Sequence, residues 1–246
     1  MGASRATLPY LRVITKAFSS LPYENATKMI KKKVARENNL SPLRWPDEVF
    51  GDYLKYGAGG TCFSLCYFLL HILRYCGFAA HIEMADRSYG TNTHCVVVCH
   101  LDEVHYLLDP GFLLYKPLHL TNQSYFQINY FLGSLIFESL PGGVLQVSTL
   151  SKGLLKKRYD LKRVSVSNED FIDYWHASFD FKGLDEIVIT SGANDQQIYL
   201  RGNYFSQETS LTKQSMHVSM PQIEKIIEGM GLNLELILKA QESKGR

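Results

Sequence analysis

Cys62 is the residue of this sequence whose surroundings best suit chemistry. It directly follows Gly59, Gly60 and Thr61 and opens an apolar stretch that runs to Cys76. A cysteine in the first turn of a helix lies at the positive end of the helix dipole, which favours the thiolate. The dipole supplies about 0.3–1 kcal/mol, less than the roughly 1.4 kcal/mol that corresponds to one pKa unit. The thiol therefore needs a further partner, and a histidine that becomes imidazolium is the usual one.

The geometry of a predicted β-hairpin selects the histidine. If residues 102–103 form a two-residue turn, Asp109 lies opposite Val96, on the same face as His94 and one diagonal step from it. Diagonal neighbours are about 7–8 Å apart at the backbone, a gap that two side chains can bridge. Asp109 would then orient His94, and His94 would pair with the sulfur of Cys62. This is the thiol–imidazole–carboxylate arrangement of nucleophilic catalysis.

Simpler interpretations exist for the same residue types. Asp109 precedes Pro110 and Gly111, so an alternative is that it serves only as a turn residue. A cysteine on an apolar helix or strand usually packs as a small hydrophobic side chain. We expect this of the four other cysteines, which are Cys66, Cys76, Cys95 and Cys99.

Metal, nucleotide-loop and nucleic-acid functions are not predicted. The sequence contains no C-x-x-C, H-E-x-x-H or H-x-x-x-H pattern, and cysteines four apart suit no standard zinc site. It also lacks the G-x-x-x-x-G-K and G-x-G-x-x-G phosphate-binding patterns. The 26 basic and 24 acidic residues give a net charge of +2, too balanced to indicate nucleic-acid binding.

Two groups of basic residues receive different interpretations. The first is predicted to be the solvated face of a helix and comprises Lys28, Lys31, Lys32, Lys33 and Arg36. The second is the better candidate for binding an anion and comprises Lys152, Lys156, Lys157, Arg158, Lys162 and Arg163.

The elements that position these residues fall into three predicted domains. Residues 1–77 form a helical domain that carries the nucleophile, with helices over 8–18, 25–36, 47–56 and 62–76. Residues 78–166 form a strand-rich domain that carries the histidine and the aspartate. Residues 167–246 mix helix and strand and begin with a capping-box-like start at Ser167. This order of elements predicts an α+β fold.

The sequence indicates a cytoplasmic protein with no membrane partner. The start of the chain lacks the apolar stretch of a secretory signal. The longest apolar run, residues 62–76, is shorter than the roughly 20 residues that span a bilayer. Five cysteines are an odd number, which no complete disulfide framework can use. We therefore expect reduced thiols.

The sequence resembles the arylamine N-acetyltransferase family along most of its length. Residues 21–25 (Leu-Pro-Tyr-Glu-Asn) are similar to the family's Pro-Phe-Glu-Asn segment, and residues 59–62 to its Gly-Gly-x-Cys nucleophile motif. Residues 90–98 resemble its histidine strand, and residues 107–112 its Val-Asp-Val-Gly-Phe segment. Residues 117–120 are similar to the Pro-Leu-x-Leu that follows, and residues 197–200 fit its last domain.

The resemblance implies a fold and a reaction. The fold is an N-terminal helical bundle, a central β-barrel-like domain and a C-terminal α/β lid, with a catalytic core like that of cysteine proteases and transglutaminases. The reaction is a ping-pong acyl transfer from acetyl-CoA, a donor substrate and not a tightly bound cofactor, to an amine such as an arylamine or hydrazine.

The resemblance also assigns roles to residues of this sequence. Cys62, His94 and Asp109 form the catalytic triad, and Cys62 carries the acyl group as a thioester. The segment of Gly59, Gly60 and Thr61 forms the nucleophile loop, whose backbone N–H groups stabilise the oxyanion. The donor-binding loop contains Gly90, Thr91 and Asn92.

The nucleophile motif departs from the family pattern Arg-Gly-Gly-x-Cys-x-Glu-x-Asn. Ala58, Ser64 and Cys66 stand where the family has Arg, Glu and Asn. Losing both partners of an ion pair can be nearly neutral for folding, whereas losing one leaves a buried charge. Because these three substitutions change the residues around the nucleophile, three alternatives for the function stay open. These are another acyl thioester, CoA-bound or carrier-bound, as donor; an amide synthase or hydrolase with the same triad; and a catalytically idle binding module.

Overall fold

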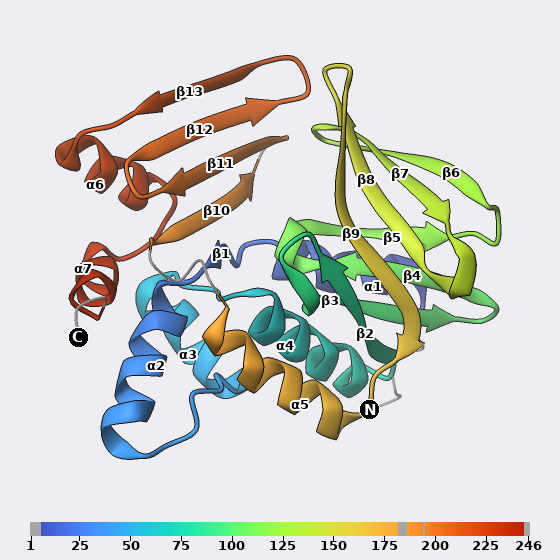
Figure 1. Ribbon diagram of the computed structural model, residues 1–246, viewed down its shortest axis with the longest axis horizontal. Helices are drawn as coiled ribbons and strands as arrows, with labels where there is room; N and C mark the ends of the chain where they lie inside the picture. The colour runs from blue at the N-terminus through green and yellow to red at the C-terminus, as the bar shows by residue number, and fades with distance from the viewer. Residues whose placement is uncertain (1–5, 182–185, 194, 244–246) are drawn as a thin grey trace.

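The computed structural model describes residues 6–181, 186–193 and 195–243 of the chain. Five helices gather at one side of an eight-stranded sheet, and a five-stranded sheet with two C-terminal helices stands beside it (Figure 1). The chain is thus an α+β protein with a helical N-terminal part, a nearly closed barrel-like sheet and a C-terminal lid, as the sequence predicts.

The helical part is built around one apolar helix, α4. Its residues Leu65, Leu69 and Leu73 are fully buried, and it packs against both α3 and the barrel-like sheet. Gly57 ends α3 with a positive φ of 65°, which a residue without a side chain adopts at little cost. The helices are α1 (Leu8–Phe18), α2 (Ala26–Asn38), α3 (Pro46–Tyr56), α4 (Cys62–Tyr75) and α5 (Asn168–Ala177).

The eight-stranded sheet is antiparallel throughout and has the strand order β5-β4-β3-β2-β9-β8-β7-β6. The β3–β4 hairpin has the predicted two-residue turn, because Leu101 pairs directly with Val104. The strands are β2 (Ala79–Arg87), β3 (Gly90–Leu101), β4 (Val104–Asp109), β5 (Leu114–Leu120), β6 (Tyr125–Tyr130), β7 (Gly133–Ser139), β8 (Leu145–Ser151) and β9 (Leu154–Ser165).

The lid sheet has the order β1-β10-β11-β12-β13, and its first strand comes from the start of the chain. Strand β1 directly precedes α2 and pairs with β10, so the lid is hydrogen-bonded to the helical part. The elements are β1 (Tyr23–Glu24), β10 (Val188–Ala193), β11 (Gln196–Arg201), β12 (Tyr204–Thr209), β13 (Lys213–His217), α6 (Met220–Gly229) and α7 (Leu234–Glu242).

Helix α5 follows the barrel-like sheet in the chain but packs against the N-terminal helices (Figure 1). Ser167 caps it, as predicted, by accepting a hydrogen bond from the backbone N–H of Asp170 at 3.0 Å. The ring of Phe171 stacks on Tyr67 of α4, with centroids 5.7 Å apart. The predicted domain boundaries at residues 77 and 166 remain a prediction, since both α5 and β1 join parts of the chain on either side of them.

None of the helices in the described part of the chain is long and apolar enough to cross a membrane.

Candidate active site

Cys62 is the first residue of α4 and lies at the wall of a cavity between the helical part and the two sheets. Thr61 is the N-cap residue, and its backbone is extended, which turns the chain sharply into the helix. The Cys62 side chain is 8% exposed, so it is sheltered yet borders the cavity. The nucleophile predicted from the sequence thus has access to a ligand.

His94 and Asp109 meet as the hairpin geometry predicts. Nε2 of His94 lies 2.9 Å from Oδ2 of Asp109, and both side chains are buried. Oδ1 of the same carboxylate accepts a hydrogen bond from the backbone N–H of Phe112 at 3.1 Å. Asp109 is therefore both a turn residue and the partner of His94, so the two interpretations of this residue are compatible. Because Nε2 of His94 contacts Asp109, Nδ1 is the ring nitrogen that remains to interact with the sulfur of Cys62.

Gly111 holds the helix and the hairpin together at this point. A Cβ atom on Gly111 would lie 2.8 Å from Cβ of Cys62 and 2.8 Å from Cε1 of His94. Both side chains therefore pack against the same backbone. Any larger residue at position 111 would force the cysteine and the histidine out of place.

The charges of the site favour a thiolate–imidazolium pair. A contact with Cys95 lowers the pKa of Cys62 well below its usual value, burial opposes this, and the contact with His94 lowers the pKa further. Burial lowers the pKa of His94, but the Asp109 carboxylate and the Cys62 sulfur raise it more, to about 9. The imidazolium and the thiolate stabilise one another, and the buried carboxylate stabilises the imidazolium.

The other buried cysteines are neutral thiols at neutral pH. Burial raises the pKa of Cys66 to about 11, that of Cys99 to about 12, and that of Cys95 well above its usual value. The Cys66 thiol donates to the backbone carbonyl of Cys95 at 3.2 Å. All five cysteines are free thiols. The described residues contain no group of three or more His, Cys, Asp or Glu side chains that could hold a metal ion.

Tyr159 covers the histidine on the barrel side and was not predicted from the sequence. Its ring centroid lies 4.8 Å from that of His94, and its side chain is 1% exposed. The hydroxyl has no hydrogen-bond partner among the described residues, and burial and the nearby Asp109 carboxylate raise its pKa well above its usual value. Tyr159 therefore stays neutral and shields the His94–Asp109 pair from water.

The cavity has a volume of about 860 Å³ and reaches from Cys62 to the lid sheet. Its wall is rich in basic side chains, which are Lys28, Arg87, Lys152, Lys156, Arg158, Arg201 and Lys213. Three of these belong to the basic group that the sequence singled out for anion binding. Of that group, Lys157 and Lys162 instead form salt bridges with Asp160 and Asp86.

The predicted donor-binding residues are the first residues of β3, directly after the turn that follows β2. Arg87, Tyr89 and Thr93 of this segment line the cavity, whereas Gly90, Thr91 and Asn92 are not part of its wall. The Asn92 side chain accepts a hydrogen bond from Lys162 at 2.6 Å. The donor-binding role of these three residues stays a prediction.

Backbone hydrogen bonds join the nucleophile loop to the segment that precedes α2. The backbone N–H of Glu24 donates to the carbonyl of Gly60 at 3.0 Å, and the N–H of Gly60 donates to the carbonyl of Pro22 at 3.4 Å. A side chain on Gly59 would overlap the carbonyl of Pro22, so glycine is required there. The N–H of Gly60 is already bonded, and the predicted oxyanion-binding role of Gly59, Gly60 and Thr61 remains a prediction.

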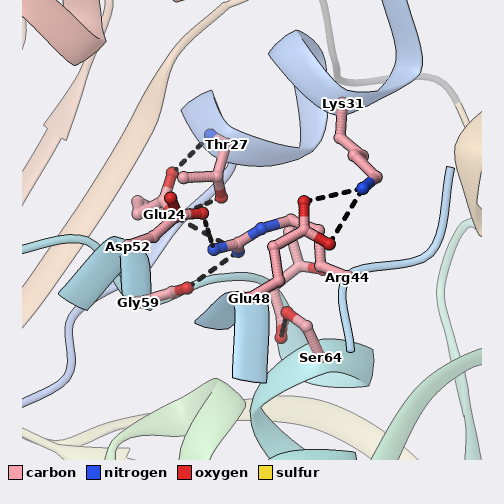
Figure 2. Close-up of polar contacts among 9 residues, drawn as sticks. Glu24, Thr27, Lys31, Arg44, Glu48, Asp52, Gly59 and Ser64 are labelled. Carbon is pink, nitrogen blue, oxygen red and sulfur yellow. Dashed lines mark hydrogen bonds and ion pairs between the residues drawn. The ribbon is translucent and has the colours of Figure 1, made fainter. Parts of the chain in front are cut away.

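The buried guanidinium of Arg44, from another part of the chain, contacts the nucleophile loop (Figure 2). Its Nη1 donates to the carbonyl of Gly59 at 2.8 Å, and its Nη2 pairs with Asp52 at 2.7 Å. Nη1 also lies 3.9 Å from Glu24, whose carboxylate accepts two hydrogen bonds from Thr27. Both Arg44 and Glu24 are buried. Although Ala58 replaces the arginine of the family motif, the loop is thus not left without a guanidinium.

Replacing Arg44 by methionine should destabilise the fold by about 3–5 kcal/mol, because it leaves the Glu24 carboxylate buried without its cation. The matched control is Lys31→Met, which breaks the neighbouring pair with Glu48 in the same view (Figure 2). That pair is about 30% exposed, and its loss should cost no more than about 1 kcal/mol. Urea denaturation of the two variants measures the difference; equal losses would contradict the importance of the Arg44 contacts.

Lys28 corrects one prediction from the sequence. It was expected on the solvated face of α2, but its side chain is 7% exposed and lines the cavity. Lys31 and Lys32, in contrast, keep partly exposed side chains. Residues 28–33 contain four lysines in six positions, and no local sequence pattern distinguishes the one whose side chain points inward.

A family model described as N-acetyltransferase matches residues 7–237, which is nearly the whole chain. The chain therefore belongs to the arylamine N-acetyltransferase family. It is an acyltransferase, and the family uses acetyl-CoA as a substrate.

Solved structures of family members share the fold. The arylamine N-acetyltransferase of Mycobacterium smegmatis has a TM-score of 0.79 at 16% identity, with 100% of this chain and 95% of that chain covered. That of Mycobacterium abscessus has a TM-score of 0.80 at 14% identity, covering 98% and 89%. The Mycobacterium marinum enzyme in complex with CoA has a TM-score of 0.78 at 15% identity, covering 96% and 93%. A search of curated proteins finds no match.

Proposed function

We propose that this protein transfers an acetyl group from acetyl-CoA to an amine by a ping-pong mechanism through a thioester on Cys62. The supporting observation is the buried His94–Asp109 pair, joined at 2.9 Å, beside a cysteine at the start of a helix on the cavity wall. These three side chains combine a nucleophile, a base and a group that orients the base.

In the first half-reaction the Cys62 thiolate attacks the carbonyl carbon of the donor thioester. The bond between that carbon and the sulfur of CoA breaks, and the leaving thiolate takes the proton of the His94 imidazolium. The products are free CoA, a neutral thioester on Cys62 and a neutral imidazole that Asp109 keeps in orientation through Nε2.

In the second half-reaction the neutral amine of the acceptor attacks the thioester carbon. His94 takes the proton that the nitrogen loses, and Cys62 leaves as a thiolate. The imidazolium and the thiolate are restored together, so the enzyme returns to its starting charges.

The basic cavity wall supports the choice of donor. Arg87, Lys152, Lys156 and Arg158 line the same cavity as Cys62, and phosphate groups favour such cations. A structure of the Mycobacterium marinum relative contains CoA. We propose a CoA-bound donor on this ground, and a cytoplasmic location in which five free thiols and a CoA thioester are both stable.

The test is intact mass spectrometry of the protein after brief mixing with acetyl-CoA. We expect an adduct of one acetyl group on Cys62, release of CoA in equal amount, and discharge of the adduct on addition of an arylamine or hydrazine. Discharge by water alone would identify a hydrolase. Absence of an adduct with every short acyl-CoA would contradict the proposed reaction.

A further inference from the structure

The tip of the β8–β9 hairpin reaches the lid sheet (Figure 1). Lys152 and Gly153 form the two-residue turn at this tip, and both have the positive φ that such a turn requires. The Lys152 ammonium donates to the carboxylate of Glu208 on β12 at 2.8 Å and to the backbone carbonyl of Thr209 at 3.1 Å. These bonds join the barrel-like sheet to the lid across the outer part of the cavity.

Glu208 is the one acidic residue among the described residues that line the cavity, whereas the basic side chains are numerous. Its Oε1 lies 2.8 Å from Nζ of Lys152, and its Oε2 lies 3.3 Å from Nζ of Lys213. The hydroxyl of Ser151 lies 3.5 Å from Oε1. Burial raises the pKa of Glu208, but the hydrogen bonds from Lys152 and Lys213 lower it more. The carboxylate is therefore an anion held by two cations inside the cavity.

A phosphate group would use the same donors. Ammonium and hydroxyl groups form charge-assisted hydrogen bonds with phosphate oxygens as they do with a carboxylate. The side chains of Lys152 and Lys213 are 31% and 50% exposed, so an incoming anion can reach them. Lys152 also lies far from the reacting sulfur, because roughly 20 Å of strand β9 separates it from Tyr159, which contacts His94. The extended pantetheine arm of CoA places its phosphates at a comparable distance from the thioester.

We propose that Glu208 occupies the phosphate subsite of the donor in the resting protein, so that CoA binds by displacing this carboxylate from Lys152 and Lys213. The inference rests on the proposed function, since it concerns the donor. The exchange replaces one anion by another, and both lysines keep a charged partner throughout. Glu208 thus lowers the affinity for donors that carry phosphate and leaves the affinity for phosphate-free thioesters unchanged. Because the same carboxylate binds the hairpin tip, its displacement also releases the lid from the hairpin.

Calorimetry of CoA binding tests the competition. In Glu208→Gln, CoA should bind about threefold to tenfold more tightly, the range expected when two partly exposed ion pairs no longer compete with the phosphates. Pantetheine, which carries no phosphate, should bind the natural protein and the variant equally. The matched control is Glu48→Gln, which removes the same charge from the partly exposed pair with Lys31. Neither residue of that pair lines the cavity, so CoA affinity should not change.

A double-variant cycle separates this competition from general repulsion between Glu208 and the phosphates. Replacing Lys152 and Lys213 by methionine removes the cations for which the two anions compete, so Glu208→Gln should then gain little affinity. Three results would overturn the proposal: weaker or unchanged CoA binding in Glu208→Gln, an equal gain for pantetheine, or a full gain without the two lysines. CoA binding is measured without turnover, so its outcome is distinct from whether acetyl-CoA forms an adduct on Cys62.

Discussion

Replacing Cys62 by alanine should lower kcat/KM for acetyl transfer by a factor of about 10⁴ or more, the loss seen when a nucleophile is removed from a catalytic triad. The physical reason is that alanine has no sulfur to attack the donor, so the thioester intermediate cannot form. The measurement is acetyl-CoA-dependent acetylation of an arylamine, followed together with the intact mass of the protein. The variant should show neither turnover nor the acetyl adduct.

Cys66→Ala is the matched control, because Cys66 lies one helical turn further along α4 and is fully buried. Burial raises the pKa of Cys66 to about 11, so it is a thiol at neutral pH and cannot replace the nucleophile. This variant should keep the adduct and most of the turnover. Loss of the adduct in Cys66→Ala, or its survival in Cys62→Ala, would assign the chemistry to a different sulfur.

The pairing of His94 with Asp109 could be predicted from the sequence because the two residues lie on one β-hairpin. His94 and Asp109 lie on consecutive strands joined by a two-residue turn, and strand pairing fixes which residues share a face. The glycines before Cys62 and the apolar run after it mark the start of a helix in the same way. Short-range rules therefore suffice to bring an acid and a base together.

The supporting residues depend on packing between distant segments and could not be predicted. Arg44 reaches the nucleophile loop from the connection between α2 and α3, and Tyr159 reaches His94 from β9. The inward turn of Lys28 follows from η3 (Ser178–Asp180), 150 residues away in the sequence. Such contacts leave no periodic pattern in the chain.

Five strands were also not predicted, namely β1, β5, β6, β12 and β13. Strand β5 contains Pro117, which lacks the N–H that a strand interior needs and is tolerated because β5 is an edge strand. Strand β13 is exposed at all five positions, so it has no apolar alternation to detect. Strands β6 and β12 are short and bury few apolar side chains, and β1 has only two residues.

Replacing Asp109 by asparagine should lower kcat by about 10⁴-fold while leaving the fold nearly intact, as for the aspartate of other triads. The asparagine keeps the shape of the carboxylate and can still accept from the N–H of Phe112. It removes the negative charge, however, and that charge is the largest of the influences that raise the pKa of His94 to about 9. The imidazolium then loses its proton at a lower pH, and the thiolate loses the cation that stabilises it.

Alkylation of Cys62 by iodoacetamide across pH 5–9 measures this effect without any substrate. In the natural protein the rate should already be high at pH 6.5, because the pKa of Cys62 is lowered well below its usual value. In Asp109→Asn the rate at pH 6.5 should fall, and the profile should move toward the pKa of a free thiol. The control is Asp160→Asn, on the same sheet, whose carboxylate pairs with Lys157 at 2.6 Å. An unchanged profile in Asp109→Asn would show that the cysteine is ionised without help from the carboxylate, and the helix start and Lys28 would then have to supply the stabilisation.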